Sequence, residues 1–211
     1  MKQDHIFFDL ETSSLDPIKG EIIDIAAIRT DSLGNVLCAC TNKVKPTKDV
    51  EASAAAVNGY NERDWKNAIP LQTAIDAINS TIMKDRTDKY AVVAYNAEFD
   101  KAFLTESCKR LDIEFPFPKR AWVDPMHMAW ILVYGDNIES RKLTSLANYY
   151  GVDIKDAHTA VGDCEIMMEV YFRMMQRFAI GQKVEKIGRN LVSEATGKIV
   201  NMVQNIGRSQ S

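Results

Sequence analysis

Two carboxylates stand close together near the start of the chain, in the segment Phe7-Phe8-Asp9-Leu10-Glu11-Thr12. The run over residues 5–8 is rich in aromatic and branched side chains and predicts a buried strand. Side chains alternate faces along a strand, so Asp9 and Glu11 should point the same way. Paired carboxylates repel each other unless a proton, an arginine or a metal ion intervenes. Residues 3–18 contain no lysine or arginine, which favours an external cation. Acids that simply face water at a strand edge are the alternative.

A second acidic cluster is Asn96-Ala97-Glu98-Phe99-Asp100, which follows the continuously apolar run Tyr90–Tyr95. This pattern predicts a buried strand that ends where a helix begins, and ligands often bind at such a sheet edge. Asn96 is expected to cap the helix. Asp100 falls in the first helical turn, where the helix dipole stabilises a carboxylate even without any ligand. The spacing does not decide whether Glu98 or Asp100 is the functional acid.

The third cluster contains His158 and Asp163. On one helix these residues would point about 140° apart, so they can converge only under one condition. His158 must lie on the loop before a helix, and Asp163 must lie in the opening turns of that helix. The positive end of the helix would favour a neutral imidazole, which suits a general base. An ordinary surface histidine is the alternative.

Hydrophobic periodicity predicts the elements that hold these residues. Strands are expected at residues 5–12, 21–30, 36–44, 90–95 and 121–123, and helices at 52–57, 70–83, 97–111, about 125–134, 143–150 and 160–179. The short connection over residues 31–35 makes the first strands antiparallel. The order predicts an α/β fold, in which a mixed five-stranded sheet has an antiparallel N-terminal meander and helices on both faces.

The composition of the 211 residues, with 46% hydrophobic and 26% charged, indicates a globular protein. There is no run of ~20 apolar residues that could span a membrane, and the N-terminus leads straight into a strand, so we expect no signal peptide and a cytoplasmic location. The cysteines form no CxxC pair and are expected to be reduced. Residues 1–180 are predicted to be one domain. Residues 181–211 are predicted to form a basic, partly helical extension, which either packs on the domain or contacts a second subunit or a replication partner.

The three clusters resemble, in order and spacing, the exonuclease motifs of the DEDDh family. This family, also called DnaQ-like, comprises 3′–5′ exonucleases of the ribonuclease-H-like superfamily. The resemblance runs from about residue 5 to residue 175. Weaker similarities support it: Val57-Asn58-Gly59, Asp124 at a predicted helix start, and Lys142-Leu143. Two departures are Ser13-Ser14, where the family usually has threonine and glycine, and Tyr95, where many members have histidine.

The resemblance implies that Asp9, Glu11, Asp100 and Asp163 hold two Mg²⁺ or Mn²⁺ ions, with His158 as general base. It also implies that Thr12, Leu15 and Asn96 contact the terminal nucleotide, with Leu15 as an apolar wedge. The expected function is the release of 5′-mononucleotides from 3′ ends, preferably of single strands. The expected substrate is DNA, in proofreading or repair. A polymerase, a replication partner or a second copy of the chain is the expected protein partner. Alternatives are an RNA exonuclease like ribonuclease T or oligoribonuclease, an endonuclease, and a non-catalytic binding subunit.

Overall fold

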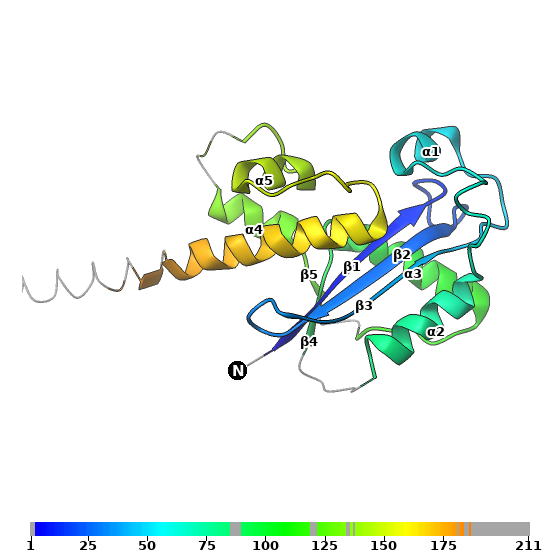
Figure 1. Cartoon of the computed structure of the whole chain (residues 1–211), viewed down its shortest axis with the longest axis horizontal. Coiled ribbons are helices and arrows are strands. Elements are labelled where there is room, and N and C mark those ends of the chain that lie inside the picture. Colours follow the sequence, from blue (N-terminus) through cyan, green and yellow to red (C-terminus); the bar gives the residue numbers. More distant parts are fainter. Residues whose placement is uncertain are drawn as a thin grey trace, which may run out of the picture. The chain divides into compact units, whose positions relative to one another are not determined.

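Five strands form one mixed sheet in the order β3-β2-β1-β4-β5 (Figure 1). The computed structural model describes residues 3–84, 90–118, 122–133, 136, 138–180, 182–183 and 186. Strands β1 (Asp4–Thr12), β2 (Ile22–Thr30) and β3 (Val36–Lys43) form an antiparallel meander. Strands β4 (Tyr90–Val93) and β5 (Trp122–Val123) run parallel to β1. The predicted α/β fold with an antiparallel N-terminal meander is therefore confirmed.

Helices cover both faces of the sheet, as predicted. The helices of the first unit are α1 (Ala52–Asn58), α2 (Leu71–Thr81), α3 (Ala97–Leu111), α4 (Pro125–Leu132), α5 (Leu143–Tyr150) and the helical residues 160–172. One core packs α2 and α3 against the sheet and contains Ile6, Phe8 and Phe103. On the other face, the ring of Phe7 lies 5.6 Å from that of Tyr171 in the helix that begins at residue 160. In Figure 1, α3 lies behind the sheet and the yellow start of this helix lies in front.

Strand β1 lies in the middle of the sheet, paired with β2 on one side and β4 on the other. Its even-numbered apolar side chains, from Ile6 to Leu10, belong to the core beneath α2 and α3. Because faces alternate along the strand, Asp9 and Glu11 project toward the opposite face, together with Phe7. The pairing with β2 shifts register between Glu11 and Thr12, where the strand ends. The acids therefore stand at the carboxyl end of a central, rigidly paired strand.

The start of α3 differs from the prediction in one respect. The expectation that Asn96 caps the helix with its side chain is wrong, because that side chain makes no capping hydrogen bond. Asn96 has φ 61° and ψ 48°, in the left-handed region, whereas a side-chain cap requires an extended backbone. The carboxylate of Asp124 instead accepts hydrogen bonds from the backbone N–H groups of Asn96 and Ala97, at 3.2 and 3.1 Å.

The chain divides into two compact units, residues 1–172 and 173–211. Of the second unit, the described residues are 173–180, 182–183 and 186, all helical. The predicted extension over 181–211 therefore lies almost wholly outside the described residues, and its boundary and partners stay predictions. No helix in the described part of the chain has the length and apolar composition needed to cross a membrane. All four cysteines lie in the described part of the chain and carry reduced thiols outside any disulfide, as predicted.

Candidate active site

Three carboxylates from two distant segments meet at the end of β1. Each of Asp9, Glu11 and Asp163 offers an oxygen, and these oxygens all lie within 4.8 Å of one another. Asp9 and Glu11 share one face of β1, and Asp163 lies in the first turn of the helix that begins at residue 160. Oxygen ligands at this spacing suit a hard divalent cation such as Mg²⁺ or Mn²⁺.

Asp100 is the fourth predicted carboxylate, and it lies beside this group of three. It is 2% exposed in the first turn of α3, and its charge helps to raise the pKa of Asp9. Glu98, the competing acid, has a side chain that is 81% exposed and forms an ion pair with Lys101 at 2.6 Å. The structure therefore assigns Asp100, and not Glu98, to the acidic cluster.

Burial and mutual repulsion dominate the electrostatics of the cluster. Burial, then Asp100, Asp163 and other nearby carboxylates, raise the pKa of Asp9 well above its ordinary value. Burial, followed by repulsion from Asp163 and Asp24, raises the pKa of Glu11 to about 8. The pKa of Asp163 is also raised, mainly by burial. Acids crowded in this way are relieved by a cation, so the donor set fits the divalent ions that the resemblance implies.

His158 lies on the loop immediately before the helix, as the spacing required. It is exposed and has φ 69°, and its backbone N–H lies 3.4 Å from Oδ1 of Asp163. The loop turns tightly, because Gly162 passes so close to Asp156 that an added Cβ would lie 1.9 Å from the Asp156 carbonyl oxygen. This close approach brings His158 back to the side of Asp163. The predicted convergence of the two residues is confirmed.

Asp124, which is distant in sequence from the second cluster, accepts hydrogen bonds at the start of the helix that carries this cluster. Besides the two N–H groups at the start of α3, its Oδ1 accepts a hydrogen bond from the N–H of Met126 at 2.9 Å, which caps α4. One carboxylate thus fixes the starts of two helices, including the turn that carries Asp100. The sequence marked Asp124 only as the start of a helix. Its link to α3 depends on a contact that sequence spacing does not show.

Asp24 is a further carboxylate at the site, which sequence reasoning missed. It pairs with Glu11 across β1 and β2, and it is 5% exposed. Its carboxylate accepts a hydrogen bond from the backbone N–H of Ile25 at 2.9 Å. Burial is the largest cause that raises its pKa, to about 6. The sequence did contain one signal for it: Asp24 is the single acid in the interior of a predicted strand made mostly of isoleucine and alanine.

The end of β1 and the turn after it hold two of the three predicted substrate contacts, Thr12 and Leu15, whereas the third, Asn96, precedes α3. Thr12 is buried, and its hydroxyl donates to the Ser14 carbonyl at 2.7 Å, while Asn58 donates to the Thr12 carbonyl at 3.1 Å. Neither Ser13 nor Ser14 has a positive φ, so this turn does not need the glycine usual in the family. Leu15 is 84% exposed, as a wedge against a nucleotide requires, and Asn96 is exposed as well.

A five-stranded mixed sheet that carries acids on its central strand, a further acid at a helix start and a loop histidine defines a nuclease domain of ribonuclease-H-like type. Residues 6–171 match the family RNase_T, described as "Exonuclease". The chain therefore belongs to this exonuclease family, which confirms its resemblance to DEDDh exonucleases.

Relatives include proteins of different sizes. The chain is 24% identical over 194 residues to the PolC-type DNA polymerase III of Caldanaerobacter subterraneus subsp. tengcongensis, a match that covers 92% of this chain and 13% of that protein. It is 27% identical over 185 residues to ribonuclease T of Haemophilus ducreyi, covering 82% of this chain and 85% of that protein. The chain thus spans only about an eighth of the PolC-type relatives, and most of ribonuclease T.

Solved structures share the fold. E. coli exonuclease I in complex with a dT13 oligonucleotide aligns with a TM-score of 0.72 at 19% identity, over 86% of this chain and 43% of that chain. The nuclease domain of 3′hExo bound to rAMP, a DEDDh family member, aligns with a TM-score of 0.70 at 16% identity, over 82% of this chain and 92% of that chain. At these identities the likeness establishes the fold of the chain.

Proposed function

We propose that this chain is a metal-dependent 3′–5′ exonuclease, which releases 5′-mononucleotides from the 3′ ends of single-stranded nucleic acid. The observation that carries the proposal is the meeting of Asp9, Glu11 and Asp163 within 4.8 Å, beside buried Asp100 and exposed His158. A structural role does not account for this arrangement, because buried carboxylates that repel one another destabilise the fold.

In this proposal Asp9, Glu11, Asp100 and Asp163 hold two Mg²⁺ or Mn²⁺ ions. When bound, such ions stabilise negative charge on the entering and leaving oxygens of a phosphodiester. His158, exposed and next to Asp163, accepts the proton of the attacking water. Leu15 packs against the terminal base, and Thr12 and Asn96 help to hold the terminal nucleotide. Asp124 supports Asp100 through the helix start that it caps.

DNA is the substrate that we propose first, in proofreading or repair, because the PolC-type relatives are named as DNA polymerases and the exonuclease I structure holds dT13. RNA is the second candidate, since ribonuclease T and 3′hExo with bound rAMP each match 82% of this chain. A polymerase or replication partner, or a second copy of the chain, is proposed to contact the basic extension over residues 181–211 in the cytoplasm.

The test is one digestion series on 5′-labelled single-stranded DNA and RNA of matched sequence, with free and blocked 3′ ends. We expect stepwise shortening from free 3′ ends with Mg²⁺ or Mn²⁺, and none after chelation. Asp9→Ala should bind nucleic acid without cutting it, whereas Glu98→Ala should stay active, because Glu98 lies outside the cluster. Internal cleavage of blocked strands would instead indicate an endonuclease. Full activity of Asp9→Ala would refute the assignment.

A further inference from the structure

A pocket of about 560 Å³ lies between the ends of β2 and β3 and the helices α2 and α3. Its wall is largely aliphatic, with Ile22, Pro46, Pro70 and Leu111 among the lining residues. Nothing in the proposed catalysis uses this pocket. An apolar hollow of this size that stays open to solvent is typical of a binding site.

The charges around the pocket are predominantly positive. Lys45, Lys48 and Arg110 line it, and Glu21 is the one carboxylate among the lining residues. Glu21 is already engaged, because its carboxylate accepts hydrogen bonds from the backbone N–H groups of Thr47 at 2.7 Å and Lys48 at 3.0 Å. In a chain with a net charge of −3, three cations around one hollow favour an anionic occupant.

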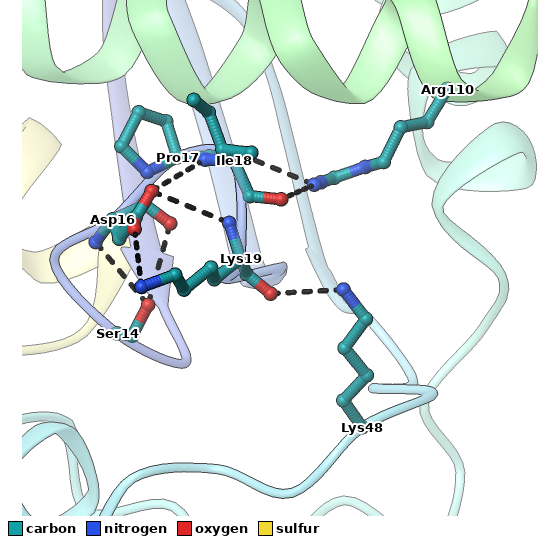
Figure 2. Close-up of polar contacts among 7 residues, drawn as sticks. All are labelled: Ser14, Asp16, Pro17, Ile18, Lys19, Lys48 and Arg110. Carbon is teal, nitrogen blue, oxygen red and sulfur yellow. Dashed lines mark hydrogen bonds and ion pairs between the residues drawn. The ribbon is translucent and has the colours of Figure 1, made fainter.

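Two of these cations donate their side-chain hydrogen bonds mainly to neutral carbonyl groups. Figure 2 shows Lys48 and Arg110 reaching the loop over residues 14–19 from the same side. Nζ of Lys48 donates to the carbonyl of Lys19 at 2.9 Å. The guanidinium of Arg110 donates to the carbonyls of Pro17 and Ile18 at 3.3 and 3.2 Å. Neutral carbonyls do not cancel the positive charges of Lys48 and Arg110, although Lys48 also interacts with the Glu21 carboxylate.

The same loop connects the pocket to the acidic cluster. Ser13, which follows shortly after Glu11, exchanges two hydrogen bonds of 2.8 Å with the backbone of Glu21 at the pocket wall. Within the loop, Asp16 accepts from the N–H of Ile18 at 2.9 Å, so the turn is held in one conformation (Figure 2). Leu15 and Ile18 are nevertheless 84% and 71% exposed. Apolar side chains presented on a rigid loop suit contact with a ligand that passes over it.

We propose that this pocket is a second nucleic-acid site, which holds the single strand upstream of its 3′-terminal nucleotide. The inference rests on the proposed function. The 3′ end lies at the acidic cluster, the strand crosses Leu15 and Ile18, and the pocket receives a base against its aliphatic wall while Lys45, Lys48 and Arg110 attract the phosphates. The continuity of the loop with the catalytic strand favours nucleic acid over an acidic peptide as the occupant.

The test variant is Lys45→Glu, because the Lys45 side chain takes no part in holding the loop, unlike those of Lys48 and Arg110. The matched control is Lys66→Glu, an exposed lysine outside the pocket. Both full-length variants are compared with the unsubstituted protein. Binding of a fluorescein-labelled oligothymidylate of about 16 nucleotides is measured in EDTA, which prevents metal-dependent cleavage, over a series of salt concentrations.

We expect Lys45→Glu to weaken binding of the long strand. The slope of log binding constant against log salt concentration should become shallower by ~0.7 for each phosphate that the variant no longer neutralises. Hydrolysis of a dithymidylate, which is too short to reach the pocket, should be unchanged. Lys66→Glu should match the unsubstituted protein in both measurements. If both variants leave long-strand affinity and slope unchanged, or reduce them equally, the nucleic-acid site is refuted, and an acidic peptide becomes the occupant to test. If the unsubstituted protein hydrolyses neither substrate with metal, the proposed function fails, whatever the binding result.

Discussion

Single residues of the acidic cluster carry the pH response of this protein. Five carboxylates come together from β1, β2, α3 and the helix that begins at residue 160: Asp9, Glu11, Asp24, Asp100 and Asp163. Burial raises the pKa of each of them above its ordinary value. An acid with a raised pKa keeps its proton longer in the folded state than in the unfolded state. Folding therefore becomes less favourable as the pH rises.

Glu11 gives this effect a defined pH window. Its pKa is 4.5 in ordinary surroundings and about 8 in the folded protein. Below pH 4.5 both states are protonated, so Glu11 imposes no penalty. Between these values the unfolded state loses its proton first, and the free energy of unfolding falls with rising pH. In EDTA, the melting temperature should therefore drop from about pH 5 to about pH 8. The melting temperature of Glu11→Gln should fall less over the same pH range. If the melting temperatures of the two proteins fall equally with pH, the raised pKa of Glu11 is contradicted.

His158 should affect rate and not metal affinity. If its imidazole accepts the proton of the attacking water, His158→Ala should lower the maximal rate by roughly 10²–10⁴-fold. The stabilisation by Mn²⁺ in thermal melts should be unchanged, because the carboxylates that bind the ion are intact. Lys155→Ala is the control, since Lys155 is exposed on the same loop as His158 and pairs with Asp153, outside the cluster. A parallel loss of rate and metal response in His158→Ala would make His158 a metal ligand.

At the scale of elements, the site depends on where helices begin. The first turn of α3 carries Asp100, and the first turn of the helix from residue 160 carries Asp163. Each start is held by a side-chain oxygen: the Asp124 carboxylate for α3, and the Thr159 hydroxyl, which accepts from the N–H of Gly162 at 3.1 Å, for the other helix. These caps fix the direction in which each acid of the cluster leaves its backbone. A shift of one helix start would therefore displace an acid from the cluster.

Asp124 tests this dependence. Asp124→Ala leaves the N–H groups of Asn96, Ala97 and Met126 without their acceptor. Loss of a single cap costs about 0.5–2 kcal/mol, so a loss at or above the upper end is expected in urea denaturation. The rate on a short oligonucleotide should fall as well, because Asp100 moves. Glu98→Ala, an exposed change in the same first turn of α3, should alter stability by only about 0.5 kcal/mol or less. Equal stability of the two variants would exclude Asp124 as the shared cap.

For the molecule as a whole, metal binding and folding should be linked. Cations that bind only the folded state relieve repulsion among the carboxylates and raise the free energy of unfolding by ~2.7 kcal/mol at a hundredfold excess over Kd. The melting temperature should therefore rise with millimolar Mg²⁺ or Mn²⁺. The rise should be larger at about pH 8 than at about pH 5, where protons compete for Glu11 and Asp9. Asp9→Ala should reduce the shift. No metal response in the unsubstituted protein would count against a divalent site.

The sequence alone determined most elements and two of the three clusters. Strand alternation placed Asp9 and Glu11 on one face, and helical periodicity required His158 to precede the helix that carries Asp163, as the structure shows. These patterns are readable because they depend on local geometry, which repeats along a single element. The element boundaries followed from the same periodicity, within a few residues at the end of β4.

Only the tertiary structure decided the rest. Glu98 and Asp100 are equivalent in sequence, but packing of α3 buries Asp100 and leaves Glu98 in water. Asp24 enters the site through strand pairing with β1, and Asp124 caps α3 across a gap in sequence, which also explains why the predicted Asn96 cap is absent. The cationic pocket likewise combines residues from β2, α2, α3 and the segment after β3. Burial, repulsion and capping between distant segments depend on how the elements pack, and no local pattern encodes that arrangement.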